Sequence, residues 1–187
     1  CEWVPDFGRA YYEDELLGKA GLDYLVAAIH FAPLPGTDDW FTPFTYPRKN
    51  DAAFLGSYVK LLVAAMESKL FLFFAHPDLY SCFFDRWTPV AAAATRDIVV
   101  AAKETGSVFE INTNGLRKPQ IPLADGTFHA PYPRDEFWRA VAEAGIPALV
   151  NSDAHRPEDI IGKLDEGRSF AARLGVNLIA PHELKDF

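Results

Sequence analysis

The chain contains 187 residues, of which 49% are hydrophobic and 24% charged, and this ordinary composition predicts one globular domain over residues 1–187. Its 18 basic and 26 acidic residues give a net charge of -8, which argues against a nucleic-acid partner but not against a small anionic ligand held by local cations. With two cysteines, Cys1 and Cys82, and no apolar run long enough to cross a bilayer, we expect a reducing, cytoplasmic setting and no membrane partner.

Short apolar runs alternate with helical patterns along the chain. In chain order we predict a strand at Leu25–Ile29, a helix at Leu55–Ser68, a strand at Phe71–Ala75, a helix opened by Thr88-Pro89 that ends near Thr105, a strand at Val108–Ile111, a helix at Asp135–Ala144, a strand at Ile146–Asn151, a helix at Glu158–Leu174 and a strand at Val176–Ala180. A proline-rich loop, 112–133, follows the third strand.

The predicted strands are apolar along their whole length, which indicates a parallel sheet covered by helices on both faces. Two architectures fit this pattern, an open doubly wound sheet and a barrel. Neither of the glycine-rich phosphate loops GxGxxG and GxxxxGK[ST] follows a strand, so a nucleotide-binding open sheet is the weaker choice. The positions of the polar residues then decide between the two architectures.

Ionisable residues stand at the carboxyl ends of four predicted strands. His30 follows the first strand and His76 follows the second. Glu110 lies in the third strand, and Asp153 and His155 follow the fourth. In a parallel barrel these ends converge on one mouth, where active sites are built, so the pattern favours a barrel.

The residue types at these positions suit metal-assisted chemistry. Imidazole and carboxylate groups without cysteine fit divalent ions such as Zn, Mn or Fe. Two or three such ions can bind a phosphate group, activate a water molecule and stabilise in-line displacement. An extended Asp153-Ala154-His155 segment points two ligands the same way, so they could serve adjacent metals. Arg117, in the loop after the third strand, is a natural bidentate partner for phosphate.

Each of these residues also has a purely structural interpretation. His30 and His76 could end a strand or a turn with satisfied rings, and Arg117 could be a solvated surface cation. For Glu110 we favour a buried carboxylate bonded to the backbone. Two further histidines, His129 and His182, are expected at the surface. Three histidines at strand ends are improbable by chance, and this makes a joint site the preferred interpretation.

Three segments resemble the PHP-type histidinol phosphatases: EINTNGLRKP at 110–119, YP at 132–133 and GIPALVNSDAHRPEDI at 145–160. Three more are similar to that family and extend the resemblance over nearly the whole chain: EWVPDFG at 2–8, LDYLVAAIHF at 22–31 and AHPDL at 75–79. The resemblance implies a distorted (β/α)7 TIM-like barrel with up to three metal ions at its mouth. It also implies hydrolysis of L-histidinol phosphate to L-histidinol and phosphate, a step of histidine biosynthesis.

The resemblance assigns a role to each site residue. The implied metal ligands are Glu2, which would bridge two ions, His30 and His76, which would complete one of these sites, Asp153 on the other bridged ion, and His155 on the third. Arg117 would hold the substrate phosphate. The nucleophile would be a metal-bound hydroxide, with no separate protein nucleophile. The implied cofactors are therefore two or three divalent ions, Zn, Mn or Fe.

The chain departs from the family at its beginning. The family opens with an H-x-H strand and has further histidine ligands before its bridging glutamate, and no such residues precede Glu2. We therefore expect a barrel that is incomplete at the N-terminus, with Glu2, His30 and His76 as its complete ligand set. A second departure is the proline-rich and aromatic stretch Ala32–Pro47, which is predicted to be a lid or an insertion.

Three functions remain open at this point. The first is a metal-dependent phosphomonoesterase that acts on histidinol phosphate. The second is a PHP phosphoesterase for another small phosphate ester, because Arg117 would recognise the phosphate and not the imidazole. The third is a non-catalytic metal-binding or partner-binding module. The sequence does not fix the oligomeric state.

Overall fold

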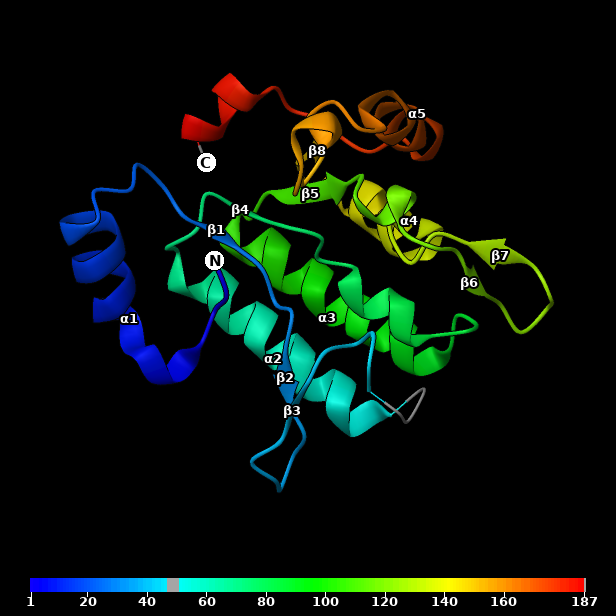
Figure 1. Ribbon diagram of the computed structural model, residues 1–187, viewed down its shortest axis with the longest axis horizontal. Coiled ribbons are helices and arrows are strands. Elements are labelled where there is room, and N and C mark those ends of the chain that lie inside the picture. The colour runs from blue at the N-terminus through cyan, green and yellow to red at the C-terminus, as the bar shows by residue number, and fades with distance from the viewer. Residues whose placement is uncertain (47–50, 187) are drawn as a thin grey trace.

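The centre of the fold is a parallel sheet, seen in a computed structural model that describes residues 1–46 and 51–186 (Figure 1). Its strand order is β1-β4-β5-β8, formed by Val26–Ala27, Phe73–Phe74, Phe109–Asn112 and Ala148–Asn151. β5 and β8 pair in register from Phe109↔Ala148 to Asn112↔Asn151. Two isolated parallel bridges, Glu2↔Ala28 and Ala148↔Leu178, extend the sheet beyond its outer strands. The predicted strand at Val176–Ala180 is thus reduced to a single bridge.

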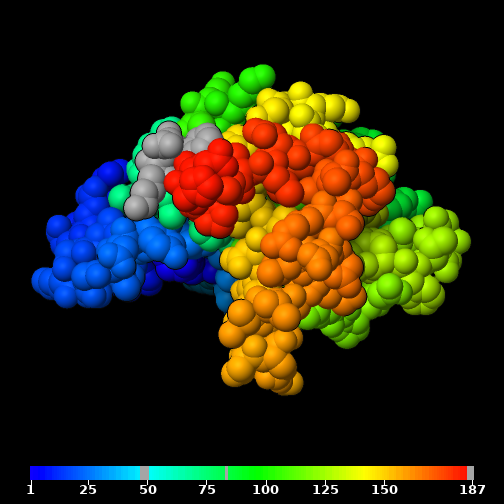
Figure 2. Space-filling view, turned by 90° about the horizontal axis from the view of Figure 1, so that it is seen from above, coloured from blue at the N-terminus to red at the C-terminus, as the bar shows by residue number. Residues whose placement is uncertain are grey.

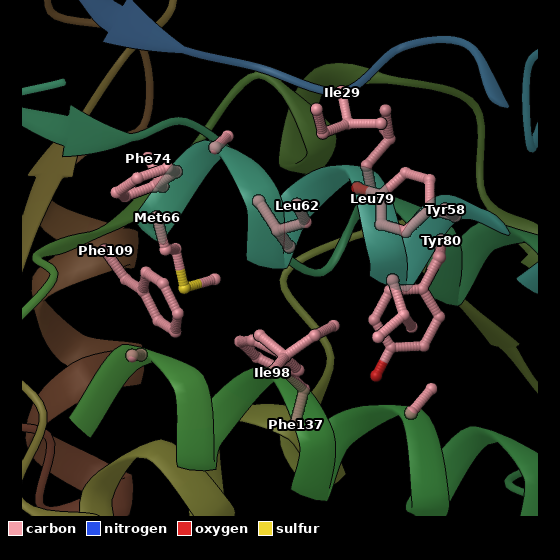
Figure 3. Close-up of a cluster of buried hydrophobic side chains, with 14 of the residues drawn as sticks. Ile29, Tyr58, Leu62, Met66, Phe74, Leu79, Tyr80, Ile98, Phe109 and Phe137 are labelled. Atoms are coloured by element: carbon pink, nitrogen blue, oxygen red, sulfur yellow. The ribbon is translucent and has the colours of Figure 1, made fainter. Parts of the chain in front are cut away.

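Four helices contribute to the main core against this sheet: α2 at Ala52–Ser68, α3 at Pro89–Thr105, α4 at Asp135–Ala144 and α5 at Leu164–Leu174. α2 and α3 lie side by side in Figure 1, and the red C-terminal segment lies across the sheet from them. The large buried side chains labelled in Figure 3 come from the end of β1, the sheet, the 3₁₀ turn Leu79–Phe83, α2, α3 and α4, and include Ile29, Phe74, Phe109, Tyr80, Leu62, Met66, Ile98 and Phe137. The core therefore lies between the sheet and these helices.

The helix boundaries follow from local capping. The Asp51 carboxylate accepts hydrogen bonds from the amides of Ala53 and Phe54 at the start of α2, and the Thr88 hydroxyl accepts one from the amide of Ala91 at the start of α3. α3 ends at Gly106, whose φ of 64° is a conformation that glycine adopts without strain. The ends of α3 match the prediction, whereas α2 begins at Ala52 and not at the predicted Leu55.

The predicted helix Glu158–Leu174 is divided in the structure. A 3₁₀ turn covers Pro157–Asp159, and α5 begins only at Leu164. Lys163 interrupts the helical path between them with a φ of 57°. The first part of the prediction is therefore wrong, because one residue in the left-handed region is enough to end a helical run.

Several short elements were not predicted. They are 3₁₀ turns at Pro5–Phe7, Leu79–Phe83, Gly115–Arg117 and Pro181–Asp186, the short helix α1 at Gly8–Ala10 that continues as a π-helix over Tyr11–Lys19, the hairpin of β2 at Ala32–Pro33 with β3 at Trp40–Phe41, and the hairpin of β6 at Ile121–Pro122 with β7 at Phe128–His129. The stretch predicted as a lid or an insertion contains the first of these hairpins, and its last residue, Pro47, lies outside the described residues.

The two faces of the sheet are covered unequally. The face opposite the main core carries a smaller cluster, in which Phe73, Val108 and Leu149 pack with Leu184 of the C-terminal 3₁₀ turn. Within the described residues, the C-terminal 3₁₀ turn is the helical element that packs on this second face. The sequence predicted helices on both faces, and on this face that cover is only partly formed. The structure supports an α/β fold, and the barrel stays a prediction. No helix in the described parts of the chain is long and apolar enough to cross a membrane.

A buried carboxylate links the segment after β4 to the start of α4. Asp78 is 1% exposed, and its Oδ2 accepts hydrogen bonds from the backbone N–H of Arg134 at 2.8 Å and from the indole N–H of Trp138 at 3.0 Å. Both donors are buried, and a buried donor without an acceptor is costly. Asp78 therefore fixes how α4 sits against the segment that carries His76.

Replacement of Asp78 by alanine is expected to lower the free energy of unfolding by about 3 kcal/mol, because two buried N–H groups would lose their acceptor. Urea denaturation followed by circular dichroism measures this loss. The control is Asp97→Ala on the exposed side of α3, for which a change below about 0.5 kcal/mol is expected. Equal losses for the two variants would contradict the proposed link.

Candidate functional site

Glu2 and His30 form a contact pair at the end of β1. The Glu2 carboxylate accepts hydrogen bonds from the backbone N–H groups of His30 at 2.7 Å and Phe31 at 3.2 Å through Oε1. Its Oε2 lies 2.7 Å from the Nδ1 of His30. A carboxylate at Nδ1 fixes the ring of a histidine and leaves Nε2 as the nitrogen that can bind a ligand. The bridge between Glu2 and Ala28 brings these residues together although they are far apart in sequence.

His76 is the buried histidine of the site. It follows β4 and is 4% exposed, and its ring centroid lies 4.8 Å from that of His30 and 5.8 Å from that of Tyr132. The pKa of His76 is lowered to about 4, mainly by burial and to a smaller extent by electrostatic repulsion from the nearby His30. Its ring is therefore neutral at pH 7. Its Nδ1 is buried and has no hydrogen-bond partner among the residues that the structure describes. A neutral imidazole with a free nitrogen is the form that binds a metal.

Glu110 supports His76 from the neighbouring strand. It is 2% exposed, and its Oε2 accepts hydrogen bonds from the backbone N–H of His76 at 3.1 Å and from the side-chain amide of Asn112 at 2.7 Å. Burial raises the pKa of Glu110 to about 7. The interpretation of Glu110 as a buried carboxylate bonded to the backbone is therefore confirmed.

Asp153 follows β8 and is held by the loop after β5. Its Oδ2 accepts a hydrogen bond from the side-chain amide of Asn114 at 3.1 Å. Its charge also acts to raise the pKa of His76, which places the two side chains within electrostatic reach. Asp153 and His76 both have positive φ values, 47° and 31°. Backbone conformations of this kind are costly outside glycine and cluster at functional sites.

His155 lies outside this group. Its side chain is 71% exposed, and its Nδ1 contacts the backbone oxygen of Asp153 at 2.9 Å. The structure thus brings Glu2, His30 and His76 together, with Asp153 nearby, and turns His155 toward solvent. Of the other histidines, His182 is exposed as expected. His129 is instead partly buried, and its Nε2 contacts the guanidinium of Arg134.

Arg117 binds both ends of the segment 152–162. One terminal nitrogen donates to the carbonyl of Gly162 at 3.0 Å, and the other donates to the carbonyl of Ser152 at 2.7 Å. Its Nε lies 3.3 Å from the carboxylate of Asp159. In Figure 2 the amber and orange atoms that include this part of the chain project from the body of the molecule. Its predicted role as phosphate ligand stays a prediction.

The donor types fit a divalent metal ion, because two imidazoles and carboxylates meet where one buried imidazole nitrogen has no partner among the described residues. The placement of the side chains is less complete. Within residues 1–46 and 51–186, no three His, Cys, Asp or Glu side chains form a group that could hold a metal. The structure therefore provides adjacent donors and not a finished ligand set.

Two residues of the site were not singled out from the sequence. Tyr132 packs its buried ring against His76, and Asn114 holds Asp153. For Asn114 the sequence did contain a signal. Asn112 and Asn114 follow the predicted strand Val108–Ile111, and polar residues at the carboxyl ends of parallel strands are placed at the active-site end of such a fold. Tyr132 belongs to the YP segment that resembles the family, but its contact with His76 joins segments far apart in the chain, and no local pattern indicates that contact.

The comparison with known proteins gives one informative similarity. No family model matches the chain. The chain is 30% identical over 155 residues to a protein of Deinococcus radiodurans named "Probable histidinol-phosphatase". The similar region covers 82% of this chain but 55% of that protein, so the chain spans little more than half the length of this relative. The similarity supports a histidinol-phosphatase-like family for this chain.

Replacement of Arg117 by alanine is expected to loosen the segment 152–162, because its two ends lose the cation that joins them. Limited proteolysis should cut this segment faster, and amide hydrogen exchange there should rise, while α2 and α3 stay protected. Arg168→Ala is the control, since this exposed arginine pairs with Asp165 on its own helix and, within the described residues, has no contact with the segment 152–162. Unchanged exchange in 152–162 would show that Arg117 does not hold this segment.

Proposed function

We propose that the protein is a metal-dependent phosphomonoesterase that hydrolyses L-histidinol phosphate to L-histidinol and phosphate, a step of histidine biosynthesis. The observation that carries this proposal is the buried, neutral ring of His76, which lies beside His30 at the carboxyl end of a parallel sheet. Its Nδ1 has no hydrogen-bond partner in the described part of the chain. The substrate is suggested by the similarity to the probable histidinol-phosphatase of Deinococcus radiodurans.

The residues that would hold divalent ions are His30, His76 and Glu2, with Asp153 for a neighbouring ion and His155 for a third. Zn, Mn or Fe suits this mixture of imidazole and carboxylate donors. When bound, such ions supply positive charge for the phosphate and activate water for in-line attack. The negative net charge of the chain also favours the accumulation of cations.

The chain's own residues prepare this site. Glu2 orients the ring of His30 through Nδ1, and Glu110 fixes the backbone of His76. Asn114 holds the carboxylate of Asp153. Each of these contacts fixes a donor before any ligand arrives, so less conformational entropy is lost on binding. Arg117 is proposed to bind the substrate phosphate, and for this it would exchange contacts with the carbonyls of its loop.

A second candidate function is a metal-binding module without turnover. It is favoured by the absence of a three-residue ligand set among the described side chains. Metal content separates the two functions, because two or three ions per chain support the enzyme, and one ion or none supports the module. A phosphoesterase for another small ester is the third possibility, and a panel of phosphate esters tests it.

The purified chain with Mn²⁺ or Zn²⁺ is expected to release phosphate from L-histidinol phosphate faster than from glycerol 3-phosphate. His76→Ala should abolish this release and lower the metal content, because a buried neutral imidazole is lost from the donor group. Colorimetric phosphate detection and elemental analysis measure the two effects, and circular dichroism shows whether the variant is folded. The control is His182→Ala, an exposed histidine. Full metal occupancy in His76→Ala would rule out His76 as a ligand.

Arg117→Ala is expected to raise the KM for histidinol phosphate by about tenfold or more, since hydrogen bonds to a charged group contribute about 1.5–3 kcal/mol. The metal content should change far less, because Glu2, His30 and His76 lie outside the segment 152–162 and Asn114 still holds the carboxylate of Asp153 when that segment loosens. Steady-state kinetics and elemental analysis on the same preparation test both statements. An unchanged KM would remove Arg117 from the phosphate site. A loss of metal with unchanged KM would mean that it serves only to hold Asp153.

A further inference from the structure

The backbone around Glu2 is held on one side by β1. The bridge consists of two hydrogen bonds, from the amide of Ala28 to the carbonyl of Cys1 at 2.9 Å and from the amide of Trp3 to the carbonyl of Ala28 at 3.4 Å. In a parallel bridge of this kind, the N–H and C=O of the residue between the two bonds point away from the partner strand. The carbonyl of Glu2 therefore faces away from β1.

The hydroxyl of Tyr12 lies on this other side. It donates a hydrogen bond to the carbonyl of Glu2 at 3.1 Å and accepts one from the backbone N–H of Val4 at 2.8 Å. The carbonyl of Val4 lies farther from it, at 3.5 Å. A residue of a neighbouring parallel strand would bond the same two groups, the C=O of one residue and the N–H of the residue two positions on. One hydroxyl, which both donates and accepts, thus takes the place of a strand residue.

Tyr12 is itself fixed in the fold. It belongs to the π-helix Tyr11–Lys19, which follows the N-terminal segment and α1 (Figure 1), and its side chain is fully buried. Its ring stacks on that of Trp3, with centroids 5.1 Å apart, and meets the ring of Phe71 edge-on at 5.7 Å. Burial raises the pKa of Tyr12, so the hydroxyl keeps the proton that it donates. The hydroxyl is therefore a rigid contact point for the backbone of Glu2.

The carboxylate of Glu2 depends on this backbone for its aim. Its two oxygens reach the backbone N–H and the Nδ1 of His30, both at 2.7 Å. The Glu2 side chain is 28% exposed, so water competes for the same oxygens. Without the hydroxyl of Tyr12, the backbone of residues 2–4 would be held on the β1 side alone, and the carboxylate could turn from His30 toward solvent.

We propose that Tyr12 is a positioning residue of the candidate site, whose hydroxyl fixes the backbone of Glu2 and thereby aims the Glu2 carboxylate at His30. The inference rests on the proposed function in one respect, the role of Glu2 and His30 as metal ligands. It adds a residue from outside the ligand group, on a helix to which no role was assigned above. The loss of such an outer contact typically lowers metal affinity by about 10–100-fold.

The first test measures the affinity for Zn²⁺ by isothermal titration calorimetry. Tyr12→Phe keeps the ring that packs on Trp3 and removes only the hydroxyl, and it is expected to weaken Zn²⁺ binding by about tenfold or more. Tyr11→Phe is the matched control, because this neighbouring tyrosine is 39% exposed, and a change below about twofold is expected. Circular dichroism shows whether both variants are folded. Equal affinities of Tyr12→Phe and the unaltered chain would overturn the inference.

The second test needs no metal. A carboxylate accepts hydrogen bonds and donates none, so the contact with Glu2 requires the proton of the neutral His30 ring on Nδ1. Long-range ¹H–¹⁵N NMR of the metal-free chain in alkaline buffer reports this tautomer. In Tyr12→Phe the proton is expected to move toward Nε2, while the exposed His182 keeps its pattern. A purely structural role would lower stability and leave the tautomer as it is, and this result overturns the inference.

The two proposals can fail separately. If no ester is hydrolysed, but Tyr12→Phe weakens Zn²⁺ binding and shifts the His30 tautomer, the phosphatase proposal fails and the role of Tyr12 stands. If histidinol phosphate is hydrolysed, and Tyr12→Phe binds Zn²⁺ as tightly as the unaltered chain, the phosphatase proposal stands and the role of Tyr12 is overturned. If the unaltered chain binds no Zn²⁺, the tautomer of His30 alone decides.

Discussion

The hydrogen bond from the backbone N–H of His76 to the carboxylate of Glu110 holds the site together. It joins the end of β4 to β5, at a point where the chain leaves the regular strand conformation and His76 adopts a φ of 31°. Such a conformation persists only where the surroundings fix it. Glu110 provides this constraint, and the pairing of β5 with β8 then relates His76 to the loop that carries Asp153.

This constraint explains why His76 differs from the exposed histidines of the chain. A histidine in a flexible turn would rotate its ring to find a partner or water. The ring of His76 is instead packed between His30 and Tyr132, and its Nδ1 has no hydrogen-bond partner among residues 1–46 and 51–186. Leaving a buried polar atom unpaired costs free energy that a structural histidine would avoid. The arrangement is reasonable for a residue whose partner is a ligand.

The helices and the strand positions could be predicted from the sequence, because they depend on local signals. Apolar spacing and the caps at Thr88 and Gly106 defined α3, and α4 was predicted with the observed ends. Most strands were predicted longer than they are, since hydrophobic runs do not show where pairing stops, whereas β5 has the predicted length and is shifted by one residue. The division before α5 depends on the conformation of Lys163 alone, and no apolar pattern reveals it.

For the site, the sequence predicted the pairing of strand ends but not the contacts between loops. His30 and His76 stand directly after apolar runs, so their approach at one sheet edge followed from parallel topology. The place of Glu2 depended on the resemblance, because the second residue of a chain carries no local signal of a long-range contact. The outward position of His155 arises from the path of the chain after Asp153, which two residues of sequence do not determine.

Burial shifts the pKa values of two buried groups at the site, His76 and Glu110, so that both favour their neutral forms. Burial raises the pKa of Glu110 and lowers that of His76, so each group is pushed toward its neutral form. The charge of Asp153 acts in the same environment, raising both values. An added positive charge near these groups would be stabilised by the carboxylates and would not have to displace a proton from His76, whose ring is already neutral at pH 7. The region is therefore better suited to a cation than to any further acid, and this agrees with a role in binding metal and, through it, phosphate.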